Sequence, residues 1–254
     1  LPVMPLAMIE IIGIACLRGA GDTRSGMWIM VGVNIINIST SWSLVLGLGP
    51  FPALGWTGIA IGTSISHAWG GLVCGALLIR GRAGLKFNPA QLIPHWSLIR
   101  RILRISLPAG GDLVTVILCH LVYMSLINSL GTYATAAHGI ALRAESMAFL
   151  SAVAFSVAAT TLSGQHLGAK SPQKAVQATW TAYAMGTSLM VVIGSLFWMF
   201  PYQIVSLFVH ENNQHVARLA APLLRLVAWC MPFLGTTIIL TGSLRGAGDT
   251  RWPW

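Results

Sequence analysis

The stretch between Ser25 and Ile79 contains no Asp, Glu, Lys or Arg. A membrane-spanning helix needs about 20 predominantly apolar residues, so this stretch is long enough for two of them. Across the chain, 55% of the residues are hydrophobic and 8% are charged, whereas soluble domains carry about 25% charged residues. Leu, Ile, Val, Ala and Gly dominate without the polar alternation of a membrane barrel. The sequence therefore predicts an all-α polytopic membrane protein.

Gly and Pro divide the chain into seven apolar segments, each of which we expect to be helical. Residues 47–52 and 131–133 have the composition of tight turns, and Pro201 ends the sixth segment. The expected segments are residues 1–17, 25–46, 54–79, 105–130, 134–165, 175–200 and 216–244. We interpret the first as a truncated membrane helix and the sequence as a fragment.

One octapeptide occurs twice. Leu-Arg-Gly-Ala-Gly-Asp-Thr-Arg stands at residues 17–24 and again, 227 positions later, at residues 244–251. An identical octapeptide at this separation indicates two homologous halves. Gly19 and Gly21 suit the end of one helix, and either Asp22 or Thr23 suits the cap of the next. We interpret both copies as tight hairpins, and a latch between conformational states is the alternative.

Basic residues occur in alternate connections between the segments. They are Arg18 and Arg24; Arg80, Arg82, Lys86, Arg100, Arg101 and Arg104; Lys170 and Lys174; and Arg245 and Arg251. The three connections between these contain no Lys or Arg. The positive-inside rule then places both octapeptides in the cytoplasm and the protein in the cell membrane as a multi-pass protein. Six crossings separate the two copies, so we expect two six-helix lobes, twelve helices when complete and about seven here.

These counts predict three regions. Residues 1–80 are expected to form the C-terminal half of an N-terminal lobe, and residues 105–254 the N-terminal part of a C-terminal lobe. Residues 81–104 are expected to form a cytoplasmic linker between the lobes. Its apolar positions from Leu98 to Leu103 follow helical spacing, which favours an amphipathic helix on the membrane surface. The basic side chains of this linker fix topology or bind lipid head groups.

Apart from Arg218 at the start of the last segment, five charged residues lie inside the apolar segments: Glu10, Asp112, Arg143, Glu145 and Arg225. Ionisable groups are costly at membrane depth and indicate function by default. From the helical rise, Asp112 and Arg143 lie at similar depth, so they are able to pair, and so are Glu145 and Arg225. Either these are static ion pairs, or a carboxylate exchanges its partner for H⁺ or Na⁺. Asp112 is the first choice for that exchange and Glu145 the second.

The surroundings of Asp112 favour it. Residues 108–111 read Pro-Ala-Gly-Gly, which weakens the helix and frees carbonyl groups for a cation, so a Na⁺ site near Asp112 is one expectation. His120 lies two turns further on, on roughly the same face, and is either a proton relay or a hydrogen-bonded core residue.

Polar residues also form a stripe in the second segment. Asn34, Asn37 and Ser41 either bond a neighbouring helix or line a wet cavity. Met and Trp, ten of each, offer a deformable surface for flat lipophilic cations, although Trp residues are also typical of the membrane interface. The four cysteines lie in apolar segments without metal-ligand spacing, so we expect no cofactor.

Several motifs together resemble a known family. The repeated octapeptide is followed, in its first copy, by a helix with Asn34-x-x-Asn37. Ala-Ala-His-Gly-Ile-Ala-Leu-Arg at 136–143 leads to Gly-Gln-His-Leu-Gly-Ala at 164–169. These residues are similar to the multidrug and toxic compound extrusion (MATE) family over nearly the whole chain. The resemblance implies twelve helices in two lobes, with the fourth to tenth present here. It also implies antiport, with export of organic cations or similar compounds against H⁺ or Na⁺.

The sequence departs from the family at two places. In one branch the fifth helix has an Asp four residues after an Asn, but Ser41 stands four residues after Asn37. In another branch the seventh helix has a Glu about eight residues after its Pro, and Val116 stands at that distance from Pro108. Asp112, one turn earlier, is the available acid.

Other functions are weighed against this one. A lipid-linked oligosaccharide flippase of the same superfamily would need a charged cavity, and Arg143 and Arg225 are the central cations available. An intramembrane enzyme would need a constellation such as HExxH, which the sequence lacks. A structural or receptor protein would not need the membrane acids. We therefore expect a monomeric, non-enzymatic transporter of small cationic or lipophilic molecules, in contact with lipids and not with nucleic acid.

Overall fold

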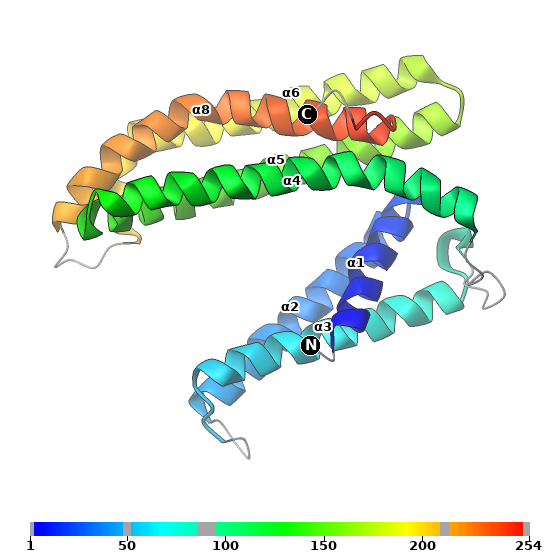
Figure 1. The fold of residues 1–254 in the computed structure, drawn as a ribbon, viewed down its shortest axis with the longest axis horizontal. Helices are drawn as coiled ribbons and strands as arrows, with labels where there is room; N and C mark the ends of the chain where they lie inside the picture. The colour runs from blue at the N-terminus through cyan, green and yellow to red at the C-terminus, as the bar shows by residue number, and fades with distance from the viewer. Residues whose placement is uncertain (1–2, 48–51, 86–94, 209–213, 251–254) are drawn as a thin grey trace. The chain divides into compact units, whose positions relative to one another are not determined.

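The computed structural model describes residues 3–47, 52–85, 95–208 and 214–250. Within these ranges the chain forms eight α-helices and one short 3-10 helix, with no strand (Figure 1). Six of the described helices, α2 to α6 and α8, are long and apolar enough to cross a membrane. The protein is therefore an all-α, multi-pass membrane protein, as predicted. The helices are α1 (Met4–Gly19), α2 (Thr23–Leu46), α3 (Trp56–Ile79), η1 (Arg82–Gly84), α4 (Trp96–Ser129), α5 (Thr132–Gly168), α6 (Pro172–Met199), α7 (Pro201–Ser206) and α8 (Gln214–Gly246).

The helices differ in detail from the expected segments. Residues 96–104, where an amphipathic helix is expected, form the beginning of α4, which continues through Pro108. A proline removes one backbone donor, and membrane helices tolerate this loss without ending. The loop expected after Pro201 begins with the short helix α7, because proline suits the first turn of a helix. Residues 48–51 of the expected turn, together with Lys86 and Arg251, lie outside the described residues.

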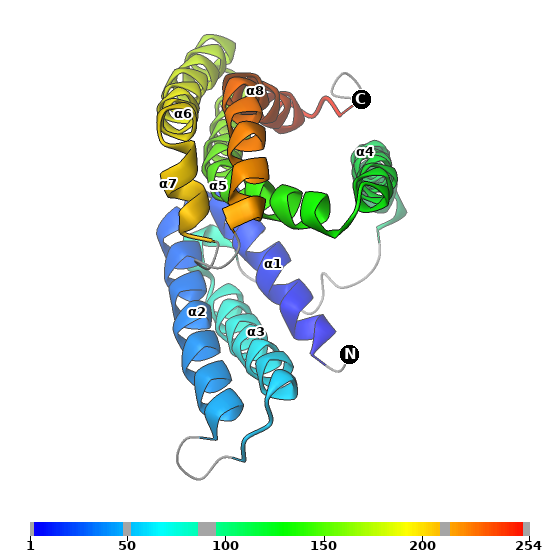
Figure 2. The ribbon, with the colours of Figure 1, turned by 90° about the vertical axis from the view of Figure 1, so that its left-hand side faces the viewer.

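The chain divides into two compact units, residues 1–95 and 96–254. In the first unit α3 packs beside both α1 and α2 (Figure 2). A stripe of small residues on α3 allows this close approach. At Gly62 an added Cβ would lie 2.9 Å from the backbone nitrogen of Ser41 on α2. The buried small residues of α3 are Gly58, Gly62, Ser66, Gly70, Gly71 and Cys74.

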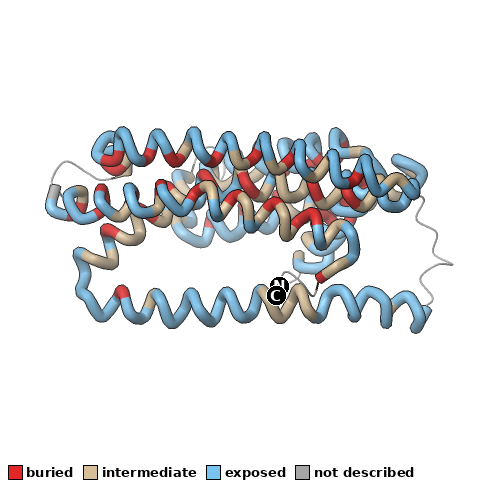
Figure 3. Tube along the Cα trace, turned by 90° about the horizontal axis from the view of Figure 1, so that it is seen from above, coloured by how far each residue is buried: buried red, intermediate tan, exposed pale blue. Residues whose placement is uncertain are grey.

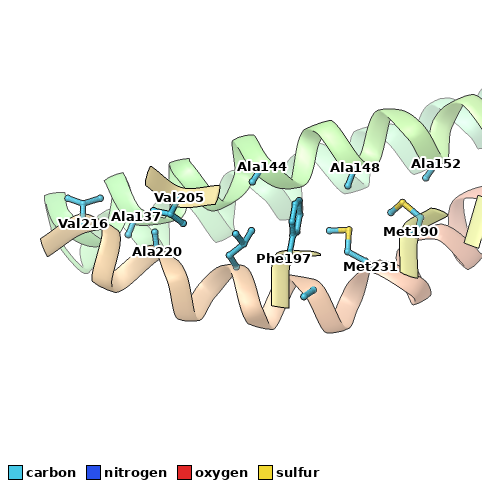
Figure 4. Packing of buried hydrophobic residues seen from close by; sticks show 12 residues of the cluster. Ala137, Ala144, Ala148, Ala152, Met190, Phe197, Val205, Val216, Ala220 and Met231 are labelled. Carbon is cyan, nitrogen blue, oxygen red and sulfur yellow. The ribbon is translucent and has the colours of Figure 1, made fainter. Parts of the chain in front are cut away.

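The second unit is built around α5, which packs against α6 and α8. Alanines recur every three or four residues along one face of α5, so that the neighbouring helices approach closely. Larger side chains from α6 and α8 fill the space opposite, among them Phe197, Met190 and Met231 (Figure 4). The buried alanines of α5 are Ala137, Ala141, Ala144, Ala148, Ala152 and Ala159.

Hydroxyl groups join the same three helices. The Ser163 Oγ atom on α5 lies 3.0 Å from Thr179 Oγ1 on α6 and 2.9 Å from Ser243 Oγ on α8. Ser243 Oγ and Thr179 Oγ1 are 2.6 Å apart. Because hydroxyl groups both donate and accept, the three are able to bond one another between the helices. This triad holds the end of α8 that leads into the second octapeptide.

Helix α4 is the exception in the second unit. Ile127 is its buried residue among those described, and the rest of the helix is exposed or half-buried. Figure 3 shows α4 as the long, mainly exposed helix along the lower edge. It meets the rest of its unit near its C-terminal end, against α5, and through one ion pair to the end of α8.

Candidate functional site

The first octapeptide forms the hairpin between α1 and α2. The amide of Ala20 donates to Cys16 O, that of Gly21 to Arg18 O, and that of Asp22 to Leu17 O, at 2.9 Å each. Gly21 has φ of +91°, which a side chain would strain. The sequence prediction of a tight hairpin is confirmed for this copy.

The second octapeptide repeats this backbone after α8. The amides of Ala247, Gly248 and Asp249 donate to carbonyl groups at the equivalent positions, at 3.0 Å each, and Gly248 has φ of +85°. Identical local sequence has therefore produced the same backbone twice. The two copies differ in what their side chains contact.

In the first copy Asp22 caps the next helix. Its carboxylate accepts hydrogen bonds from Ser25 N at 3.0 Å and Ser25 Oγ at 2.7 Å. It also accepts from Nε of Arg82 at 2.8 Å. The Arg82 hydrogen bond, followed by those from Ser25, lowers the pKa of Asp22 from 3.8 to about 2. These contacts fasten the hairpin to the residues that follow α3.

In the second copy Arg245 pairs with Asp112. The Nη2 atom of Arg245 lies 2.5 Å from Oδ2 of Asp112 on α4. The side chains are 35% and 28% exposed, so the pair is only partly desolvated. The partner expected for Asp112, Arg143, is wrong: Arg143 is exposed on α5, whereas the end of α8 brings a guanidinium to Asp112.

The other charged candidates of the second unit stay apart. Glu145 is half-buried, and Arg225 on α8 is exposed. No ion pair joins them, or either of them to another described residue. Similar depth along two helices was therefore not sufficient to predict an ion pair, because the two side chains must also lie on helix faces that meet.

His120 belongs to a row of rings that crosses from α4 to α5. Its centroid lies 6.4 Å from that of Tyr123, which lies 5.2 Å edge-on from His138. The Nε2 atom of His138 is buried and has no hydrogen-bond partner among the described residues. Sequence reasoning missed Tyr123 and His138. Their signal was the nearly helical spacing of His120 and Tyr123, together with His138 on the next segment.

Glu10, the buried acid of the first unit, has a partner that was not predicted from the sequence. Oε2 of Glu10 on α1 lies 2.9 Å from Nδ1 of His67 on α3. Glu10 is 1% exposed, the most completely buried carboxylate among the described residues. His67 is the one histidine in the stretch from Ser25 to Ile79, and that isolation was the available signal.

The three polar residues of the stripe on α2 make different contacts. Asn37 Nδ2 donates to Thr63 Oγ1 at 3.2 Å and Ser66 Oγ at 3.3 Å, which joins α2 to α3. Asn34 Nδ2 donates to the carbonyl group of Met30 within its own helix, at 2.9 Å. Ser41 Oγ is buried without a hydrogen-bond partner among the described residues. Asn37 therefore serves helix packing, while Asn34 is exposed.

Neither a metal centre nor a cofactor site is indicated by the described side chains. They contain no group of three His, Cys, Asp or Glu able to hold a metal ion. A hollow of about 630 Å³ lies between α6 and α8 and is lined mainly by apolar side chains that include Trp198, Trp229 and Phe233. A surface of this kind suits an acyl chain or an aromatic, lipophilic molecule.

Two solved structures share the fold. One, described as the crystal structure of MATE in complex with MaD3S, aligns with a TM-score of 0.86 at 19% identity, covering 96% of this chain and 53% of that chain. The other, MATE in the bent conformation, gives a TM-score of 0.83 at 19% identity with the same coverage. Such likeness at low identity shows the fold.

Sequence relatives and a family model agree with the fold. The chain is 29% identical over 257 residues to the probable multidrug resistance protein YoeA of Bacillus subtilis (strain 168), covering 98% of this chain and 54% of that protein. It is 30% identical over 256 residues to the multidrug resistance protein NorM of Burkholderia vietnamiensis, covering 97% and 55%. The chain thus spans about half the length of these curated relatives. The MatE family model matches residues 108–254, more than half of the chain. The chain therefore belongs to the MatE family, as its octapeptides and Asn-x-x-Asn helix led us to expect.

Proposed function

We propose that this chain is part of a secondary antiporter that exports organic cations or similar lipophilic compounds in exchange for H⁺ or Na⁺. Its relatives named multidrug resistance proteins support the substrate class. The observation that carries the proposal is the ion pair of Asp112 with Arg245, at 2.5 Å. In this pair a carboxylate within a membrane-length helix, α4, is neutralised by a guanidinium from another helix, α8.

The pair suits a site that opens and closes. An arginine stays charged at all accessible pH values, so Asp112 changes its partner only when α8 and α4 separate. Partial exposure of both side chains keeps the cost of separation below that of a fully buried pair. Once separated, Asp112 in lipid needs another positive charge, which H⁺ or Na⁺ supplies. The exchange of partners couples the ion to the helix movement.

The proposal includes the organisation expected from the sequence. Residues 1–80 belong to one six-helix lobe and residues 105–254 to the other, with the linker 81–104 and both octapeptides in the cytoplasm. The lobes rock about the binding site, so that it opens alternately to each side of the membrane. Glu145 is the second candidate for the coupling acid. Arg143, Arg225 and His120 are candidates for contacts along the substrate or proton path. Asn34, Asn37 and Ser41 are candidates for the lining of a polar cavity, with Asn37 shared between that role and packing.

Transport by the full-length protein tests the proposal. In inside-out membrane vesicles, an imposed H⁺ or Na⁺ gradient is expected to drive uptake of tetraphenylphosphonium. Asp112→Asn keeps the size of the side chain and removes its charge, so gradient-driven uptake is expected to fall about tenfold, equivalent to roughly 1.4 kcal/mol.

The matched control is Asp22→Asn, the same chemical change outside the membrane helices. Uptake by this variant is expected to equal that of the wild-type protein. Failure of the wild-type protein to transport any of a panel of lipophilic cations would overturn the function. Unchanged uptake by Asp112→Asn would instead remove Asp112 from the coupling role.

A further inference from the structure

A buried acid–base pair lies in the first unit, away from Asp112. Glu10 on α1 is 1% exposed, and its Oε2 atom is 2.9 Å from Nδ1 of His67 on α3. An added Cβ at Gly70 would lie 2.7 Å from the Glu10 carboxyl carbon, so α3 is shaped to admit this carboxyl group. The His67 side chain is 38% exposed, so its ring reaches the surface of the unit. The pair therefore joins a buried carboxyl group to an accessible imidazole.

The remaining charges around this pair are few. On α1, Cys16 and Arg18 lie about two turns beyond Glu10. On α3, the Cys74 thiol is 4.0 Å from the carbonyl oxygen of Glu10. The charged residue of α2 is Arg24, in its first turn. Among the described titratable side chains, His67 is therefore the one in direct contact with the Glu10 carboxylate.

We infer that the pair of Glu10 and His67 is a proton-binding site that releases one H⁺ when an organic cation binds. The inference rests on the proposed transport function and names H⁺ as its coupling ion at this site. With one proton the pair is neutral overall, either as carboxylic acid and imidazole or as carboxylate and imidazolium. Loss of that proton leaves a buried negative charge, which is stable only beside a new cation.

The exchange balances in charge and atoms. The N–H or O–H bond of the pair breaks, and the proton leaves to water through the exposed His67 ring. The fixed positive charge of the substrate then lies on the exposed side of the His67 ring and balances the negative charge of Glu10 across it. No other bond changes, and the net charge of the site stays constant.

The surroundings favour H⁺ over Na⁺. Hard cations such as Na⁺ prefer several oxygen ligands. Here the carboxylate is hydrogen-bonded to a ring nitrogen and closely covered by Gly70, and Val33 reaches the same position from α2. A proton needs one acceptor and no coordination shell. The Asp112 site differs from this one because its partner, Arg245, is permanently charged, so the two helices must separate before Asp112 can exchange partners.

Proton release by the purified full-length protein tests the inference. Tetraphenylphosphonium is the probe, since it carries a fixed charge and no exchangeable proton. In weakly buffered detergent solution with a pH-sensitive dye, the wild-type protein is expected to release protons as the probe binds. Glu10→Gln keeps the shape and the hydrogen bond to His67, and its release is expected to fall by one proton per molecule. Cys74→Ser, which alters packing beside the Glu10 backbone, is the control expected to release as many protons as the wild-type protein.

A second variant keeps the test decisive if Glu10→Gln does not fold. His67→Asn leaves the carboxyl group but removes the imidazole, and with it the ion-paired form of the proton-bound site. The pH midpoint of proton release is then expected to move, because one of the two proton-bound forms of the pair is lost.

The outcomes separate the two proposals. Absence of both transport and probe binding in the wild-type protein overturns the transport function and the proton site with it. Transport by the wild-type protein together with undiminished proton release by Glu10→Gln, or an unmoved midpoint in His67→Asn, overturns the proton site alone.

Discussion

The two octapeptide hairpins have the same sequence and the same backbone but different surroundings. In the first copy Asp22 accepts hydrogen bonds from Ser25 in the first turn of α2 and from Arg82 after the end of α3. In the second copy Arg245 reaches Asp112 within α4. Local sequence determines the backbone of the turn. The helices packed around each copy determine which of its charged side chains makes an ion pair. A motif that is structural in one half thus becomes part of a candidate transport site in the other.

The membrane acids of the two units differ in a related way. Glu10 is fully buried beside a histidine, whereas Asp112 is partly exposed beside an arginine. Histidine gains and loses a proton near neutral pH, but arginine does not. The first pair is therefore able to change its charge without movement, while the second changes only by separation.

The largest expected effect separates the equivalent glycines of the hairpins. An added Cβ at Gly246 would clash with the carbonyl oxygen of Thr160, whereas nothing lies within 4 Å of one at Gly19. Gly246→Ala is therefore expected to destabilise the protein by about 3 kcal/mol, and Gly19→Ala by less than about 0.5 kcal/mol. Thermal unfolding of the purified protein checks both. Equal effects at the two positions would show that the hairpins have equivalent surroundings.

The next effect concerns the equivalent arginines. Arg245→Ala leaves Asp112 without its cation, and because the pair is about one third exposed we expect a loss of roughly 1–2 kcal/mol. Arg18→Ala removes a half-buried side chain that packs near Gly26, so a change below about 0.5 kcal/mol is expected. Unfolding midpoints measured with and without Asp112→Asn test the pairing. If Arg245 acts through Asp112, the two changes combined cost less than their sum.

Some features of the molecule were predictable from its sequence, and some contacts between helices were not. Absence of charge over the stretch from Ser25 to Ile79 was enough to predict membrane helices, and the glycines of the octapeptide were enough to predict a hairpin. Those features are local, because residues within a few helical turns of one another determine them. The partner of Asp112 was predicted wrongly, because helical rise gives the depth of a residue but not the face that meets a neighbour. His67 was missed for the same reason, since nothing local indicates that α3 packs beside Glu10.

A smaller effect is expected from removal of the first hairpin's cap. Asp22→Ala deletes the acceptor for Ser25 N and for the Arg82 side chain. Because the site is exposed and water replaces these contacts, we expect the thermal midpoint to fall by only about 2 °C. Transport is expected to persist, in contrast to Arg245→Ala. Loss of transport in Asp22→Ala at normal protein levels would show that both hairpins are needed for transport.

The smallest effect is the pH dependence of that same contact. The pKa of Asp22 is lowered from 3.8 to about 2, chiefly by its hydrogen bond from Arg82. A depressed folded-state pKa adds stability that is fully present above the unfolded-state value and is lost as the pH falls toward the folded-state value. The difference in thermal midpoint between the wild-type protein and Arg82→Gln is therefore expected to be constant at neutral pH and to shrink between pH 3.8 and about 2. Arg245→Gln serves as the comparison, because it is expected to alter transport at neutral pH as well. A difference for Arg82→Gln that stayed constant down to pH 2 would mean that Arg82 holds the hairpin by packing rather than through the charge of Asp22.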